Sequence, residues 1–521
     1  MYSGFDPFKP LRFWCQKVLP TVYDDSLSYY EALCKIGRNV NDLGEAINNI
    51  INTGSWNAVI AYTRPEFFGA VGDGVADDSD AVQSALNDGE SEHKFVLLSK
   101  KYLIGKTLNV PDGVVVIGQY GGSLVSKQTQ VSGFVPTQIM SLGNDDVFIN
   151  VVFDGNAPSG ASQAQGDRDN HNALIRGDNL NNLMFYGCKF KNYDTNWSQY
   201  VSSIEYVCVG LRYCTNVTFE KCRFERIRRE CIILGTCENV VIDSCTFNTG
   251  NEAGVYTEIG IYKGSNFQIL NTTINHGDSV TTSPINAMGD NITIDNCSII
   301  AKASTFGIDY GNELGEDYPL DGLSISNCYI QTSISAAGTS ETIKHDNIRI
   351  YNNVIDRTGV TTASGQVMLY AFNGERIKVF NNEFRGSVEG EKYAIRTSFT
   401  DGDIEIVNNI FDSKGIRTGS NTVGLVVNNN VFNDIGFYIG NAPEAISDFP
   451  ILNCRFNADL GKIASGVYYY NVIFVGCYLA NESIYWATSA LPHFTHYDAS
   501  LSYVASTGKG TVLPDDEQDD T

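Results

Sequence analysis

The sequence predicts a right-handed, single-stranded parallel β-helix of about 12–13 coils, with a short α-helical stem and a capping helix before it. Two observations carry this prediction. A repeat of about 26 residues alternates in the manner of β-strands, and polar residues recur at the same place in successive repeats. A third observation, a heptad pattern near the N-terminus, predicts the stem.

The repeat is plain from Asn182 onward. Copies such as NVTFEKCRF from Asn216, NITIDNCSI from Asn291 and NIRIYNNVI from Asn347 continue to Asn471, and a shifted copy begins at Asp146. The second, fourth and ninth positions are apolar, which is typical of two strands that each bury one face and meet at a corner. One such coil cannot bury its apolar face alone, so the coils must stack.

Each corner carries a polar pair whose members form columns. The sixth position is mostly Asn, and the seventh alternates between Cys and Asn. Asn tolerates left-handed backbone, and its amide can bond the coils above and below. Seven of the thirteen cysteines fall in the seventh column, which predicts small, buried, free thiols. Four more cysteines repeat at the 23-residue interval of their coils, so we interpret them as stacked columns rather than zinc ligands, and we expect neither a metal nor a cofactor. These four are Cys208, Cys214, Cys231 and Cys237.

The net charge and residue content of the chain limit the classes of molecule that we expect it to bind. The net charge is −24, only 18% of residues are charged, and the chain holds 28 Tyr and 27 Phe. An acidic field repels nucleic acid and anionic membranes, so we expect neither as a partner. No apolar stretch is long enough to cross a bilayer, and we find no secretory signal. We therefore expect a protein that is made in a cytosol and either stays there or leaves by cell lysis.

Residues 29–50 carry apolar positions spaced alternately by four and three. This heptad seam predicts a coiled coil, and isoleucine at both seam positions favours three strands. The alternative is a single amphipathic helix packed on its own domain. The predicted stem residues are Leu33, Ile36, Val40, Leu43, Ile47 and Ile50.

The segment GAVGDGVADDSDAVQSAL, residues 69–86, predicts a tight turn at Gly72 and Gly74 followed by a helix with one apolar face. Such a helix suits the open end of a β-helix, which must be covered. We therefore divide the chain into an attachment and stem region, a leading and capping segment, the β-helix, and a C-terminal segment with an acidic tail. Their bounds are 1–60, 61–145, 146–485 and 486–521.

FFGAVGDGVADDSDAVQSAL and the NVTIxNCxF-like copies together resemble the pectate-lyase-like β-helix superfamily, especially its phage tail-spike branch. PLRFWCQKVLPTVYDDSLSYYEALCKIGRNVNDL resembles the attachment segment of phage tail and appendage proteins. The resemblance implies a virion homotrimer that joins a tail or collar protein through its N-terminal segment. It also implies binding, and often cleavage, of a host polysaccharide, such as a capsule or a teichoic-acid-like polymer, during adsorption. The superfamily includes hydrolases, lyases and binders, and its polygalacturonase signatures are absent from the sequence.

The family's coil order places a groove on the outer face of the first strand. Glu230 and Glu258 precede equivalent strands in consecutive coils, and Asp309 lies two coils further. Adjacent strands are ~4.8 Å apart, and glycosidases use carboxylates ~5 Å or ~6.5–9.5 Å apart. We therefore predict Glu230, Glu258 and Asp309 as catalytic groups of a depolymerase, and we favour a glycoside hydrolase over a lyase. The alternative for each acid is a solvated surface charge.

An arginine cluster at residues 212–229 predicts a site for an anionic glycan, because arginine forks suit carboxylate and phosphate. Ion pairs with neighbouring glutamates are the alternative. The predicted substrate-binding residues are Arg228, Arg229, Tyr256, Lys263 and Tyr310. Three other functions stay open: a binding-only adhesin, a lyase with a Lys, Arg or Tyr base, and a bacterial lyase-like enzyme without a virion role. The heptad stem and the missing signal argue against the third.

Overall fold

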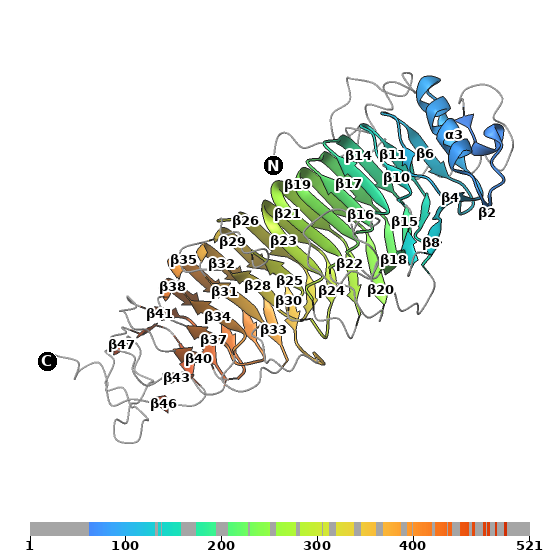
Figure 1. Cartoon of the computed structure of the whole chain (residues 1–521). Coiled ribbons are helices and arrows are strands. Elements are labelled where there is room, and N and C mark those ends of the chain that lie inside the picture. The colour runs from blue at the N-terminus through green and yellow to red at the C-terminus, as the bar shows by residue number, and fades with distance from the viewer. Residues whose placement is uncertain are drawn as a thin grey trace, which may run out of the picture.

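A computed structural model describes residues 62–496 with gaps, the longest being 158–172, 194–206, 440–448 and 464–471. The six predicted stem residues lie outside the described residues, so the stem stays a prediction. The described chain forms an elongated solenoid with helix α3 (Ser79–Ser91) at its N-terminal end (Figure 1).

Each coil consists of three strands. In one coil these are β16 (Val209–Arg212), β17 (Thr215–Glu220) and β18 (Arg223–Ile227). Apart from the antiparallel pair of β8 (Gln128–Gln130) and β9 (Phe134–Pro136), the strands pair in parallel with their equivalents in the next coil. First and second strands thereby build a 29-stranded sheet and third strands a 16-stranded sheet. The parallel β-helix is therefore confirmed.

The second strands matter most for the site described below. In some central coils the first and second strands form one continuous element. The elements that contain the second strands of the central coils are β14 (Asn181–Tyr186), β19 (Ile232–Asp243), β21 (Ile259–Leu270), β23 (Ile285–Asp295), β26 (Asp321–Ser326), β29 (His345–Tyr351), β32 (Gly374–Phe380) and β35 (Thr400–Val407).

The stack holds more coils than the sequence repeat shows. Strands β4 (Lys101–Ile104) and β7 (Ser123–Ser126) precede Asp146 and pair in the same sheet as β12 (Val152–Asp154). Their corners lack the Asn-Cys pair, and Tyr120 instead takes the left-handed backbone at φ 51°. The sequence before Asp146 therefore lacks the repeat motif, although the strands of the coils are present.

Apolar side chains of the three strands fill the interior and stack on themselves from coil to coil. The ring centroids of Phe190 and Phe224 are 4.6 Å apart, those of Phe224 and Phe247 are 4.5 Å apart, and the rings are nearly parallel. These rings occupy the ninth position of the repeat. The same periodicity that predicts the strand therefore creates a continuous aromatic column.

The polar columns form as predicted. Asn353, Asn382, Asn409 and Asn430 are buried, and each of the first three donates its amide to the Oδ1 of the next at 3.0 Å. An outer ladder runs through residues with positive φ, such as Asn352 and Asn381. All eleven described cysteines are buried, which confirms the predicted columns of small, buried side chains for this part of the chain.

Helix α3 covers the first coil with one apolar face, of which Val82, Ala85 and Leu86 are almost wholly buried. The carboxylate of Asp78 accepts the backbone N–H groups of Val71 at 2.7 Å and Gly72 at 3.0 Å, so it ties the preceding loop to the helix start. In the described residues, no helix has the length and apolarity needed to cross a membrane.

Candidate functional site

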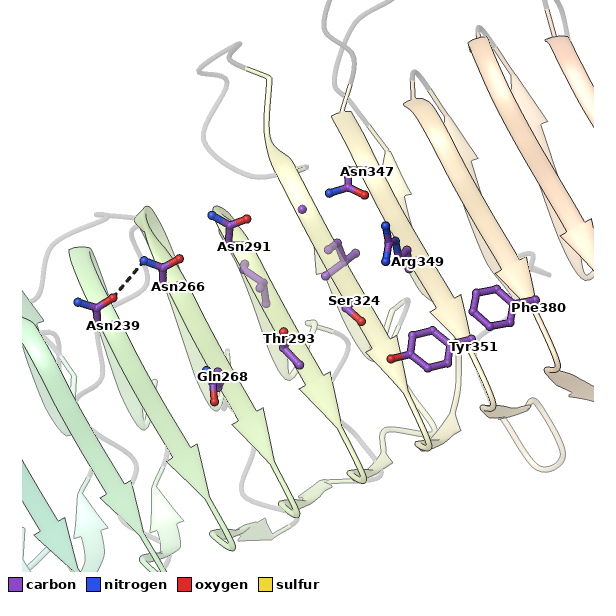
Figure 2. Close-up of a pocket in the computed structure, with 13 residues that line it drawn as sticks. Asn239, Asn266, Gln268, Asn291, Thr293, Ser324, Asn347, Arg349, Tyr351 and Phe380 are labelled. Atoms are coloured by element: carbon purple, nitrogen blue, oxygen red, sulfur yellow. Dashed lines mark hydrogen bonds between the residues drawn. The ribbon is translucent and has the colours of Figure 1, made fainter. Parts of the chain in front are cut away.

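A groove of about 870 Å³ runs over the outer face of the second strands, across the coils of β19, β21, β23, β26, β29 and β32 (Figure 2). The sequence predicted a groove on the neighbouring first-strand face instead. The groove crosses many coils at ~4.8 Å each. It is therefore long enough for an extended ligand that lies along the solenoid axis.

The groove forms where an asparagine ladder is interrupted. Asn266 donates to Asn239 at 3.0 Å, but the equivalent position two coils later is Gly322, at φ 84°. A Cβ at Gly322 would lie 2.8 Å from Oδ1 of Asn291. Within the described chain, the side-chain amides of Asn291 and Asn347, on either side of the glycine, have no hydrogen bond. The missing side chain thus leaves a hollow with two amides available to a ligand.

The wall of the groove changes character along its length. Gln268, Thr293 and Ser324 occupy one row in successive coils and offer amide and hydroxyl groups. At the other end, Tyr351 and Phe380 stack with ring centroids 4.8 Å apart and planes 2° apart. Figure 2 shows these two rings side by side on adjacent strands. Polar groups at one end and an aromatic face at the other suit a sugar polymer.

Arg349 continues the row of Ser324 and is the one charged side chain among the groove-lining residues that the structure describes. It is exposed and has no hydrogen bond or ion pair within the described part of the chain. The neighbouring charges are already paired. Lys378, its partner in register, bonds Glu405 at 3.0 Å, and Asp346 on its own strand is held by Arg376.

Three carboxylates border the groove at the start of the second strands. Asp290, Asp321 and Asp346 belong to successive coils, and Asp321 is in register with Asp346. The backbone N–H of Asp321 donates to Oδ1 of Asp290 at 2.9 Å. Asp321 itself is exposed and immediately precedes Gly322, so it is the acid of this row nearest in sequence to the hollow.

The predicted pair of Glu230 and Glu258 is not assembled as expected. Glu258 is wholly buried, where it bonds Nδ1 of His276 at 2.8 Å and the hydroxyl of Thr249 at 2.7 Å. Glu230 is half-buried. Because Ile232 is in register with Ile259, the two acids are offset by one residue. A one-residue offset directs side chains to different sides, so Glu258 is an interior group rather than a partner of Glu230.

The other predicted residues lie apart from the groove. Tyr310 is wholly buried against His345, with ring centroids 5.2 Å apart, because it alternates inward with Ile308. Asp309 points the other way and is 7% exposed. Lys263 is exposed on β21. Arg228, Arg229 and Tyr256 lie outside the described residues.

Sequence reasoning missed the groove although two signals were present. Gly322 stands in a column where most coils have Asn, and Tyr351 and Phe380 are aromatic residues at one outer position of adjacent coils. Within the described residues, no three His, Cys, Asp or Glu side chains gather as a metal site.

No protein-family model matches the chain. A capsule K30/K69-specific depolymerase of Klebsiella phage K64-1 is 48% identical over 60 residues, which are 11% of this chain and 7% of the relative. The pre-neck appendage protein of Bacillus phage phi29 is 24% identical over 31% of this chain and 24% of the relative.

Among solved structures, the tailspike of E. coli bacteriophage HK620, in complex with a pentasaccharide, has a TM-score of 0.46 at 12% identity, covering 84% of this chain and 80% of that one. The matches span less than a quarter of each curated relative. In sequence, the chain is thus similar to a capsule depolymerase and to an appendage protein of phages.

Proposed function

We propose that this chain is a phage tail spike or appendage protein that binds and depolymerises a polysaccharide on the host surface. The observation that carries the proposal is the long, open groove, lined by amides, hydroxyls and a stacked aromatic pair. The similarity to a capsule depolymerase and to an appendage protein of phages points in the same direction.

The groove offers the two kinds of contact that a sugar polymer needs. Sugar hydroxyls both donate and accept, as do the amides of Asn291 and Asn347 and the hydroxyls of Thr293 and Ser324 taken together. The apolar face of a sugar ring can pack on Tyr351 and Phe380. Since these contacts are spread over successive coils, a polymer gains affinity that a monosaccharide does not.

For cleavage we propose hydrolysis by carboxylates at the groove border. Adjacent strands are ~4.8 Å apart, close to the ~5 Å between the two carboxyl groups of retaining glycosidases. Asp290 and Asp321 belong to adjacent coils, and the backbone N–H of Asp321 lies 2.9 Å from Oδ1 of Asp290, whereas Asp346 is engaged by Arg376. Glu230 and Asp309 stay as alternative catalytic candidates. Lys263 stays as a predicted binding residue and a candidate base for a lyase.

The test is incubation of the purified chain with bacterial surface polymers, including the K30 and K69 capsules and wall teichoic acids. New reducing ends and shorter chains are expected from at least one polymer. Asp321→Asn should abolish the reducing ends while the polymer still binds, and Glu90→Gln on the exposed face of α3 should change neither.

The other outcomes separate the alternatives. Unsaturated products would identify a lyase, and loss of activity in Glu230→Gln but not in Asp321→Asn would place catalysis on the predicted acid. Binding without any shortening would identify an adhesin. Failure to bind every polymer would overturn the proposed function.

A further inference from the structure

We propose that the groove recognises an anionic polysaccharide, with Arg349 binding the carboxylate or phosphate of a sugar whose ring lies on the Tyr351–Phe380 pair. This inference rests on the proposed function, because it names the chemical class of the polymer that the groove binds.

The charge of Arg349 is the first argument. The chain has a net charge of −24, yet this exposed guanidinium makes no ion pair with any described residue. Its neighbours Lys378 and Asp346 are neutralised by Glu405 and Arg376. The end of the groove therefore keeps one uncompensated positive charge. A guanidinium presents a planar fork that fits carboxylate and phosphate oxygens in a bidentate manner.

The position of Arg349 is the second argument. Arg349 and Tyr351 lie two residues apart on the same face of β29, hence ~7 Å apart along the strand. Phe380 extends the aromatic surface to the next coil. One sugar can therefore lay its ring on the aromatic pair while its acidic substituent reaches the guanidinium.

The rest of the groove is neutral. In the row of Arg349, the two preceding coils offer the hydroxyls of Ser324 and Thr293. On the N-terminal side of Gly322, the groove-lining residues offer further side-chain amide groups. The pattern therefore fits a polymer in which an acidic sugar is followed by neutral ones, and the single cation sets which end of the repeating unit lies at the aromatic pair.

The predicted arginine cluster offers a weaker anion site in the described chain. Arg212 is bonded to Asp178 at 2.7 Å, and Lys221 lies 3.3 Å from Glu220. These two cations are already paired with acids, and in Lys221 the partner is a neighbouring glutamate, as the alternative interpretation of the cluster expected. Arg349 differs from them because it lines the groove and its charge is not compensated.

The experiment measures the affinity of the full chain for whichever polymer of the panel binds most tightly, in its native form, after carboxyl reduction and after removal of phosphate. Arg349→Gln should weaken binding of the native polymer by roughly 10- to 100-fold, the loss of a charge-assisted hydrogen-bonded pair. One of the two chemical treatments should weaken the wild type to the same degree and thereby identify the anion.

Two variants complete the design. Lys101→Gln is the control, because Lys101 is an exposed cation on β4, outside the groove and the arginine cluster, and likewise has no ion pair within the described residues. It should bind as the wild type does. Arg349→Lys keeps the charge and loses the fork, so an intermediate affinity is expected.

Three results would contradict the inference. If Arg349→Gln binds like Lys101→Gln while Tyr351→Ala still weakens binding, the groove is the binding site but the charge of the polymer does not contribute to its recognition. If neither chemical treatment weakens binding, the polymer is recognised as a neutral glycan. If no polymer binds, the proposed function fails together with the inference.

Discussion

At the scale of single residues, burial decides what an acid can do. Glu258 and Asp146 are both wholly buried. The carboxylate of Asp146 accepts the N–H groups of Val114 at 3.1 Å and Gly143 at 2.7 Å. Such acids stabilise coils, and a sequence cannot distinguish them from catalytic acids.

Replacement of Glu258 separates these two roles. Glu258→Ala removes the partner of His276 and Thr249, so we expect the free energy of unfolding to fall by about 2–3 kcal/mol, as for a buried group left unsatisfied. Binding of polymer below the melting temperature should be unchanged. A variant with wild-type Tm but no cleavage would instead support the predicted catalytic role.

Asp146 predicts a pH dependence. Burial raises the pKa of its carboxyl well above the ordinary value of 3.8. The folded state therefore binds the proton more tightly than the unfolded state, and this group's contribution to stability falls as pH rises from about 3.8 through the folded pKa. In Asp146→Asn, the part of the pH dependence of the unfolding free energy that comes from this carboxyl should be absent. Denaturant unfolding of both proteins at a series of pH values measures it. Identical pH slopes for wild type and variant would contradict it.

The thiols provide a further test. Burial raises the pKa of Cys231 and Cys222 well above the ordinary value. Eleven of the thirteen cysteines are buried, and the remaining two, Cys15 and Cys34, lie outside the described residues. In the native protein we therefore expect a thiol reagent to label Cys15 and Cys34 at most. Rapid native labelling of a Cys15→Ser, Cys34→Ser variant would show that the columns are open.

At the scale of elements, the corner ladder joins consecutive coils. Asn382 donates to the carbonyl of Ile350 at 2.8 Å and to Asn409 at 3.0 Å, and it accepts from Asn353. Asn433, by contrast, is exposed and bonds Asp412 at the surface. The same residue type therefore contributes differently to stability inside the corner and at the surface after a third strand.

We expect Asn382→Ala to cost several kcal/mol, since it leaves more than one buried group unsatisfied at ~1–3 kcal/mol each. The exposed control, Asn433→Ala, should cost well under ~1 kcal/mol. Thermal or denaturant unfolding of the two variants measures both values. Equal losses would mean that the inner ladder is not a principal link between coils.

The elements also show how far sequence reasoning reaches. The strands, the corner columns and the capping helix could be predicted because each follows from a period in the chain. The leading coils could not, since their corners use Tyr120 in place of an Asn pair. The groove could not either, because it arises from one missing side chain at Gly322 and from neighbours that meet only after stacking.

At the scale of the whole molecule, the trimer is a proposal that follows from the heptad seam of residues 29–50. The intact chain should have a solution mass of three times 57.1 kDa by light scattering. Replacement of Ile36 and Leu43 by aspartate should give monomers that retain the β-helix by circular dichroism. A trimer that persists in this variant would move the association to the coil faces.

The pairing of each coil with the next also determines how the length of the solenoid can change. Because each coil touches only the coils next to it, one extra coil before β19 would displace the groove by ~4.8 Å along the axis and leave its walls intact. The length of the solenoid and the set of residues that line the groove can therefore change independently. Duplication of a single coil would thus lengthen the distance between helix α3 and the groove without changing the residues that line the groove.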